Sequence, residues 1–216
     1  MVARRFKEAD VLLSDLAGRY PASLAGFAAR TTAALLANEH ARAEALVRAW
    51  IRDRPADGWG LRLLAGVAER RGDVAAATDA YKQLIATEFA APMDYNNLAW
   101  EGLFTGEPHE TLLDWARRAV DQTRSTDPGI LNTLATLYAE GGSTRQALEL
   151  VWRSMEIDGG DDPRPEDHYV IGRMAEAYQL NDIARESYSK VPEPRAIENR
   201  ATSVKALAER RLKNLK

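Results

Sequence analysis

Residues 131–155 read LNTLATLYAEGGSTRQALELVWRSM, and they contain the clearest indication of the fold. Small and apolar residues recur at helical spacing on both sides of a Gly-Gly-Ser turn, which is typical of two amphipathic helices. Glycine commonly ends a helix and serine commonly starts one, so the turn separates the two helices well. The stretch therefore predicts a helical hairpin, with Ala135 in its first helix and Ala147 in its second.

The template of the second helix returns along the chain at a fixed interval. The small residues Ala9, Ala43 and Ala77 are spaced 34 residues apart, and Pro21 and Pro55 repeat that interval. A period of this length indicates a stack of similar helical units, none of which can bury its apolar face alone.

The repeat continues into the second half of the chain with a small drift. The equivalent positions are Leu112, Ala147 and Ala184, at intervals of 35, 35 and 37 residues, because the turns acquire extra residues. Antiparallel helices approach closely only where a side chain is small, and larger side chains then fill the flanking space. We therefore expect these positions to lie buried at helix crossings.

This pattern resembles the tetratricopeptide repeat, whose period is 34 residues. Residues of the 131–155 stretch match the leucine, small, tyrosine, glycine and alanine positions of that family: Leu134, Ala135, Tyr138, Gly142 and Ala147. The resemblance spans nearly the whole chain. It departs from the family pattern at Leu112, where alanine is usual, and at Gln179, where the turn glycine belongs.

The resemblance implies an all-α fold, a right-handed superhelical α-solenoid of tetratricopeptide-like hairpins with about twelve helices. We expect a single domain over residues 1–216. It comprises a leading helix at 3–19, five hairpins over 22–191 and a C-terminal capping helix at 198–215.

The closing helix is amphipathic, as a solenoid cap should be. Its apolar face carries Val204, Leu207, Ala208, Leu212 and Leu215, and its basic residues are Lys205, Arg210, Arg211 and Lys213. Basic side chains suit a helix C-terminus. A cap is favoured over a nucleic-acid or lipid site because a single short helix carries the charge.

The resemblance also implies a concave groove lined by the first helices. With Ala65, Ala99, Ala135 and Gly172 at the small crossing position, a set of aromatic, amide and charged residues faces this groove. The set is Trp59, Arg62, Glu69, Arg70, Asn96, Trp100, Asn132, Thr136, Tyr169 and Arg173. Trp, Tyr and Arg are the residues that most often anchor interfaces. The alternative is that Trp100 packs between repeats and that the two asparagines only tolerate solvated helix turns.

Composition excludes several classes of protein. The chain has 45% hydrophobic and 28% charged residues, a net charge of -3 and no cysteine. These values predict a soluble globular protein that binds neither nucleic acid nor membrane and has no disulfide. There is no signal-peptide core and no apolar run of about twenty residues, so a cytoplasmic location is expected. A periplasmic location applies if the chain is a fragment of an exported protein.

No pattern of residues predicts catalysis. His40, His109 and His168 fall in separate hairpins, and the acidic loop at 158–167 lacks the alternating ligands of a calcium site. Neither glycine pair belongs to a phosphate-binding motif. We therefore expect no enzyme activity, no metal and no cofactor.

A second resemblance concerns the segments 95–100, 133–140 and 208–212. They are similar to the C-terminal tails of large bacterial transglutaminase-like proteins of unknown function.

Taken with the repeat and the groove residues, the sequence favours a scaffold that binds a protein or peptide partner in its groove. The alternative is a structural or self-association module, the tail of a larger bacterial protein, whose copies form a homo-oligomer.

Overall fold

The computed structural model describes residues 2–20, 23–55, 57–194 and 200–215. By internal contacts the chain divides into two compact units, Met1–Ala90 (unit 1) and Ala91–Lys216 (unit 2). Unit 1 contains α1 (Val2–Arg19), α2 (Leu24–Leu36), α3 (His40–Asp53), α4 (Gly58–Arg71) and α5 (Val74–Ile85). Unit 2 contains α6 (Pro92–Thr105), α7 (His109–Gln122), α8 (Pro128–Glu140), α9 (Thr144–Asp158), α10 (Asp167–Ala177), α11 (Asn181–Ser189), the 3-10 turn η1 (Arg200–Thr202) and α12 (Val204–Asn214).

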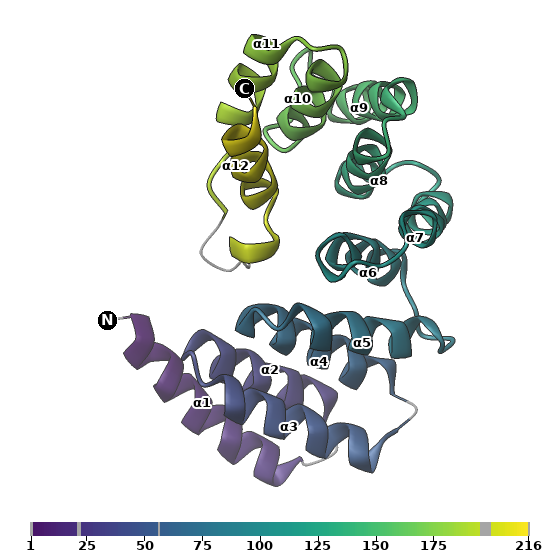
Figure 1. Ribbon diagram of the computed structural model, residues 1–216. Helices are drawn as coiled ribbons and strands as arrows, with labels where there is room; N and C mark the ends of the chain where they lie inside the picture. Colours follow the sequence, from purple (N-terminus) through teal and green to yellow (C-terminus); the bar gives the residue numbers. More distant parts are fainter. Residues whose placement is uncertain (1, 21–22, 56, 195–199, 216) are drawn as a thin grey trace. The chain divides into compact units, whose positions relative to one another are not determined.

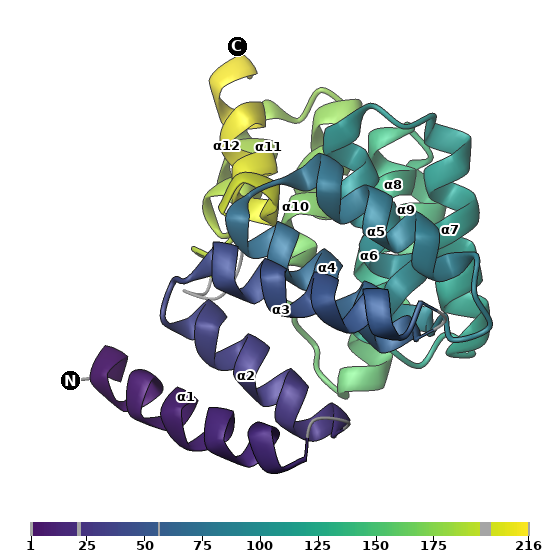
Figure 2. The same cartoon turned by 90° about the horizontal axis from the view of Figure 1, so that it is seen from below.

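In unit 1, α1 packs on α2, and the hairpins α2–α3 and α4–α5 follow one another (Figure 2). Phe27 of α2 stacks on Trp50 of α3, with 4.3 Å between the ring centroids. The indole Nε1 of Trp50 donates to Asp57 at 2.5 Å, so the same ring is held by the residue that precedes α4. Aromatic stacking thus joins α2 to α3, and the indole N–H of Trp50 links this hairpin to the start of the next.

Unit 2 consists of the hairpins α6–α7, α8–α9 and α10–α11, followed by η1 and α12 (Figure 1). Each first helix packs on its own second helix, and α8 also packs on α6, α7 and α10. Within this unit, η1 and α12 lie on the side of the first helices (Figure 1). This last arrangement positions the site described below.

Local sequence explains where many of the helices begin and end. The side chains of Asp57, Asp73 and Asp127 accept hydrogen bonds from backbone N–H groups in the first turns of α4, α5 and α8. Gly72 and Gly106 follow α4 and α6 with φ of 74° and 76°, a left-handed conformation that glycine adopts without steric cost.

The prediction that the small residues of the repeat lie buried holds in the second helices of the hairpins, whereas Ala9 of α1 is only half-buried. Ala43, Ala77, Ala147 and Ala184 are fully buried in the second helices, and the larger Leu112 is nearly so. In the first helices Ala65, Ala99 and Ala135 are fully buried, and a Cβ atom at Gly172 would collide with the ring of Tyr188. Close helix crossings therefore select these residues.

The all-α solenoid fold of tetratricopeptide-like hairpins is confirmed, with twelve α-helices in the described part of the chain. α1 corresponds to the leading helix. The closing helix differs from its expected range of 198–215, because it begins at Val204, directly after Ser203, whose hydroxyl caps it. Positions 198–199 lie outside the described residues. One continuous domain over 1–216 stays a prediction.

Candidate functional site

The four groove residues predicted in unit 1 all lie on α4, and Trp59 is the most exposed of them. The Trp59 side chain is 50% exposed at the start of the helix. The guanidinium of Arg62 lies over its ring, 5.2 Å from the centroid, and donates to the backbone oxygen of Phe89 at 3.1 Å. Phe89 is itself 51% exposed. Trp59, Arg62 and Phe89 form one accessible group, called the Trp59 cluster below.

Glu69 and Arg70 lie at the other end of α4 and are half-buried. The hydroxyl of Tyr81, on α5, donates to Glu69 at 2.8 Å. Burial raises the pKa of Glu69, against the opposing effects of this hydrogen bond and of the Arg70 charge. Glu69 therefore links the two helices of its hairpin. The same link recurs in unit 2, where Tyr188 of α11 donates to Glu176 of α10 at 2.8 Å.

In unit 2 three of the predicted groove residues are buried polar groups. Asn96 of α6 is 8% exposed, with its Nδ2 3.6 Å from Met93 Sδ. Thr136 of α8 is fully buried. The Nδ2 of Asn132 donates to the carboxylate of Asp167 at 2.7 Å, and this bond joins α8 to α10. These three side chains are buried, and their role as contacts for a partner stays a prediction.

Tyr169 and Arg173 of α10 converge on Glu140 at the end of α8. The Tyr169 hydroxyl donates to Glu140 Oε1 at 2.5 Å, and Arg173 Nε donates to the same oxygen at 2.8 Å. Arg173 also pairs with Glu176 at 2.8 Å. Burial and the nearby carboxylate raise the pKa of Tyr169, so its proton stays in this hydrogen bond at any physiological pH.

Glu140 also holds the closing helix. The guanidinium of Arg211, on α12, contacts Glu140 Oε2 at 2.6 Å and Glu176 at 3.7 Å. Burial acts to raise the pKa of Glu140, but the Tyr169 hydroxyl and the two guanidiniums outweigh it and lower that pKa. The carboxylate is therefore ionised and binds α12 through a charged, partly desolvated pair.

The other end of this C-terminal segment, residues 200–215, is held by α6. The indole Nε1 of Trp100 donates to the backbone oxygen of Thr202 at 2.7 Å. The Thr202 hydroxyl lies 3.3 Å from Glu101 Oε1, and both side chains are buried. Trp100 also makes an edge contact with Phe104. The indole of Trp100 thus binds the chain itself, and its place in a partner-binding groove stays a prediction.

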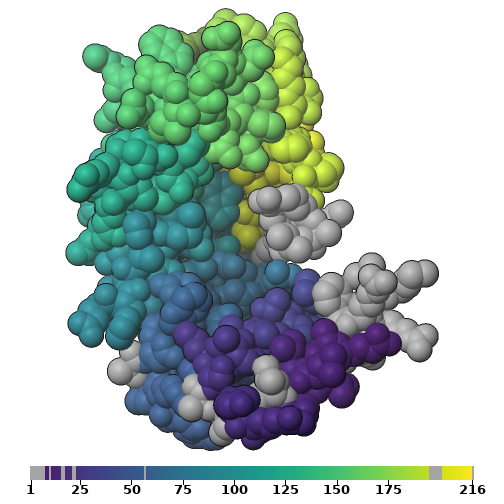
Figure 3. Space-filling model, turned by 180° about the vertical axis from the view of Figure 1, so that it is seen from behind, coloured from purple at the N-terminus to yellow at the C-terminus, as the bar shows by residue number. Residues whose placement is uncertain are grey.

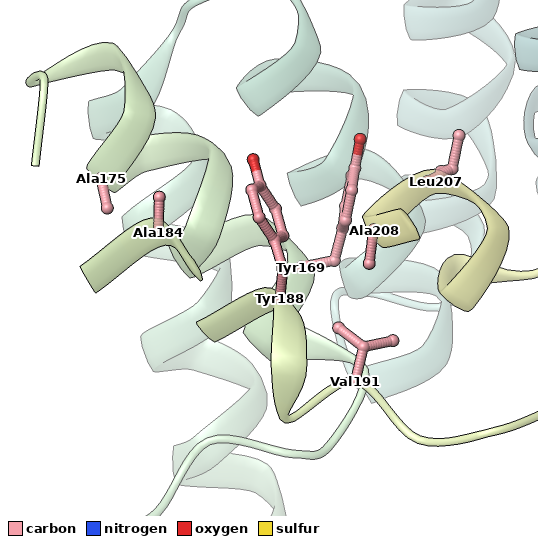
Figure 4. Close-up of a cluster of buried hydrophobic side chains, with 7 residues drawn as sticks. All are labelled: Tyr169, Ala175, Ala184, Tyr188, Val191, Leu207 and Ala208. Carbon is pink, nitrogen blue, oxygen red and sulfur yellow. The ribbon is translucent and has the colours of Figure 1, made fainter. Parts of the chain in front are cut away.

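Between these two ends the segment rests on an apolar cluster (Figure 4). The rings of Tyr169 and Tyr188 lie side by side, with centroids 5.6 Å apart, and Leu207 and Ala208 of α12 complete the cluster beside them (Figure 4). Viewed from behind, the yellow end of the chain lies beside the green helices of unit 2 (Figure 3). A pocket of about 210 Å³ borders this contact and is lined by Glu140, Tyr169, Leu207, Arg210, Arg211 and Asn214.

We call the surface that receives the segment the inner face of unit 2. It comprises Trp100, Glu101, Glu140, Tyr169, Glu176 and Tyr188. Sequence reasoning missed Glu140, Glu101, Glu176 and the occupant itself. The basic residues of the closing helix were a signal, but Glu140, the partner of Arg211, lies 71 positions away. Glu101, the partner of Thr202, lies 101 positions away.

Within the described residues there is no group of three or more His, Cys, Asp or Glu side chains that could hold a metal ion. The described helices also include none that is long and apolar enough to cross a membrane. The inner face is equipped for binding, because it presents an indole donor, carboxylates and aromatic surface.

The solved structures with this arrangement of helices are tetratricopeptide-repeat (TPR) proteins. YrrB, described as a TPR protein with an unusual peptide-binding site, is 14% identical, with 94% of this chain and 98% of YrrB covered and a TM-score of 0.64. PilW, a type IV pilus biogenesis factor, is 12% identical, with 87% and 85% covered and a TM-score of 0.68. PilF of Pseudomonas aeruginosa is 15% identical, with 97% and 93% covered and a TM-score of 0.58.

No protein-family model matches the sequence, and no curated protein sequence matches it. The likeness is therefore one of fold: the chain is built as a TPR-like helical solenoid.

Proposed function

We propose that the chain is a non-catalytic scaffold that binds a segment of a partner protein against the first helices of its hairpins. The TPR-like fold supports this role, because stacked helical repeats present extended surfaces for binding. The likeness to YrrB, which is described as having a peptide-binding site, points the same way.

The observation that carries the proposal is the Trp59 cluster. A half-exposed tryptophan, under a guanidinium and next to a half-exposed phenylalanine, combines the residue types that dominate binding energy at interfaces. Arg62 is already fixed by its bond to the Phe89 carbonyl, so little side-chain entropy remains to be lost on binding. We expect a partner to cover this cluster.

Affinity capture from a lysate of the source cells tests the proposal. A Trp59→Ala, Arg62→Ala double variant should lose the partner, because truncating a central anchor costs about 2 kcal/mol or more, roughly a thirtyfold loss of affinity. Trp152→Ala is the matched control, since Trp152 lies on α9 and is 60% exposed. Equal capture by the parent and the double variant would contradict the proposal.

A second candidate function is self-association, and exposed apolar side chains of α9–α11 favour it. These residues are Trp152, Tyr178, Leu180 and Ile183. Exposed apolar groups of this size often mark contacts between proteins. Sedimentation at several concentrations distinguishes the two functions: a dimer that Trp152→Ala disrupts and Trp59→Ala preserves would support self-association.

A further inference from the structure

The C-terminal segment reaches further than a terminal cap needs to. A cap covers the last helix of a stack, and α12 does pack on α11. The segment also bonds to Trp100 in the first hairpin of unit 2 and to Glu140 in the second. It therefore runs along the inner face across three successive hairpins, as a bound peptide would.

Three of the contacts that hold the segment are of kinds that another peptide could make. The indole of Trp100 donates a hydrogen bond to the backbone carbonyl of Thr202, and any residue has such a carbonyl. The tyrosine pair packs in one cluster with apolar side chains of α12, here Leu207 and Ala208. None of these contacts depends on the segment being covalently joined to unit 2.

The third contact is electrostatic and gives the site its preference. Glu140 and Glu176 both face Arg211, and among the described residues of the site's own side it is Arg173 that pairs with both glutamates. Without Arg211 the inner face would carry an excess of negative charge in a partly buried position. Such a surface favours a positively charged occupant, because an unpaired buried carboxylate is costly.

We propose that the inner face of unit 2 is a binding site for a basic amphipathic helix. Residues 200–215 fill it within the same molecule, and a segment of the same chemistry from a partner protein fills it after displacing them. The occupant is specified by a carbonyl for the indole, an apolar pair for the tyrosines and an arginine for the two glutamates. This goes beyond the proposed function, because the surface is distinct from the Trp59 cluster and either can fail without the other.

Residues 200–215 are covalently joined to unit 2. In the absence of a partner we therefore expect them to occupy the inner face most of the time. A tethered segment has an effective concentration on the order of 1 mM at its site. A free peptide whose intrinsic Kd is about 10 µM would then bind roughly a hundredfold more weakly than to the open site. Release of the tethered segment should therefore raise the affinity for a free peptide strongly.

The test uses a fluorescent synthetic peptide with the sequence of residues 200–216 and the full-length chain. In the Arg211→Glu variant the new carboxylate faces Glu140 and Glu176, so the segment should leave the inner face. We expect fluorescence anisotropy to show peptide binding at least about tenfold tighter to this variant than to the parent. Lys213→Glu, the same reversal at an exposed position of α12, is the control and should behave as the parent does.

Two further measurements make the result decisive. A peptide that carries the Arg211→Glu change itself should not bind the opened variant. If circular dichroism shows that the Arg211→Glu chain does not fold, Arg211→Gln replaces it as a milder change, with binding at least about threefold tighter expected. A folded variant that takes up the peptide no better than the parent would overturn the proposal, and so would a variant that forms a dimer and takes up no peptide.

Discussion

Single residues at the helix crossings determine how closely neighbouring helices can pack. Ala147 is fully buried where α9 meets its neighbours, and alanine leaves just enough room for two backbones to approach. A larger side chain there must displace a helix or be pushed out of its rotamer. The consequence can be measured.

Ala147→Arg should lower the free energy of unfolding by roughly 3 kcal/mol or more, because it overpacks the crossing and buries a charge. Urea denaturation followed by circular dichroism measures the change. Gln146→Arg, at the exposed neighbouring position, should change stability by no more than about 0.5 kcal/mol. Equal midpoints for Ala147→Arg and the parent would contradict the crossing assignment.

The turn after α10 contains a residue in an unfavourable backbone conformation. Gln179 has φ of 61°, whereas glycine occupies the left-handed position after α4 and α6. A side chain in this region costs about 1 kcal/mol relative to glycine. Gln179→Gly should therefore raise the free energy of unfolding by about 0.5–1 kcal/mol.

The reverse change provides the control for this turn. Gly106 has φ of 76°, with open space where a Cβ atom would lie, so Gly106→Gln should cost about 1 kcal/mol through the backbone alone. Thermal denaturation measures both changes. A stability for Gln179→Gly below that of the parent would show that the Gln179 side chain contributes more than its strained backbone costs.

At the scale of elements, unit 2 is held together by polar links between helices as well as by packing. Asn132 with Asp167 joins α8 to α10, and Glu140 with Arg211 joins α8 to α12. Breaking one partner of such a link leaves the other partly buried without its counter-charge.

Glu140→Gln should destabilise unit 2 by about 1–2 kcal/mol at pH 7, because Arg173 and Arg211 lose the charge they share. The difference from the parent should depend on pH. Since the pKa of Glu140 is lowered in the folded chain, its contribution is complete above about pH 4.3, the ordinary glutamate value, and is lost as the pH falls through the lowered pKa.

Urea denaturation of the parent and the variant at pH 7 and pH 3 measures this effect. Comparison with the variant is necessary because burial raises the pKa of Asp167, whose contribution to stability changes in the opposite direction with pH. Glu149→Gln, in an exposed pair with Arg145, should cost less than about 0.5 kcal/mol. A Glu140→Gln difference that is equally large at both pH values would contradict the ionised link.

For the whole molecule, net charge makes a separate prediction. A charge of -3 provides no sustained positive field, and the basic Arg211 is already paired with glutamates. We expect the chain not to retard duplex DNA in a gel at about 150 mM salt. Retardation that weakens steeply with added salt would show a phosphate-binding surface that the charge balance does not predict.

The helices, their pairing into hairpins and the small residues at the crossings could be predicted from local patterns in the sequence. These follow from local periodicity, from capping residues such as Asp73 and Gly72, and from an interval that repeats along the chain. The groove positions of Trp59 and Trp100 stay predictions, although register within a helix is a local property.

The contacts that those surfaces make could not be predicted from the sequence and are seen in the folded chain. The pairing of Trp100 with Thr202 and of Glu140 with Arg211 joins residues 102 and 71 positions apart, beyond the reach of any periodic pattern. The closing helix is equally amphipathic whether it covers the end of a stack or lies along its inner face, since both surfaces accept an apolar stripe. The position of the closing helix depends on which carboxylates and aromatic rings the folded hairpins bring together. Those groups are far apart in the sequence and meet only in the folded chain.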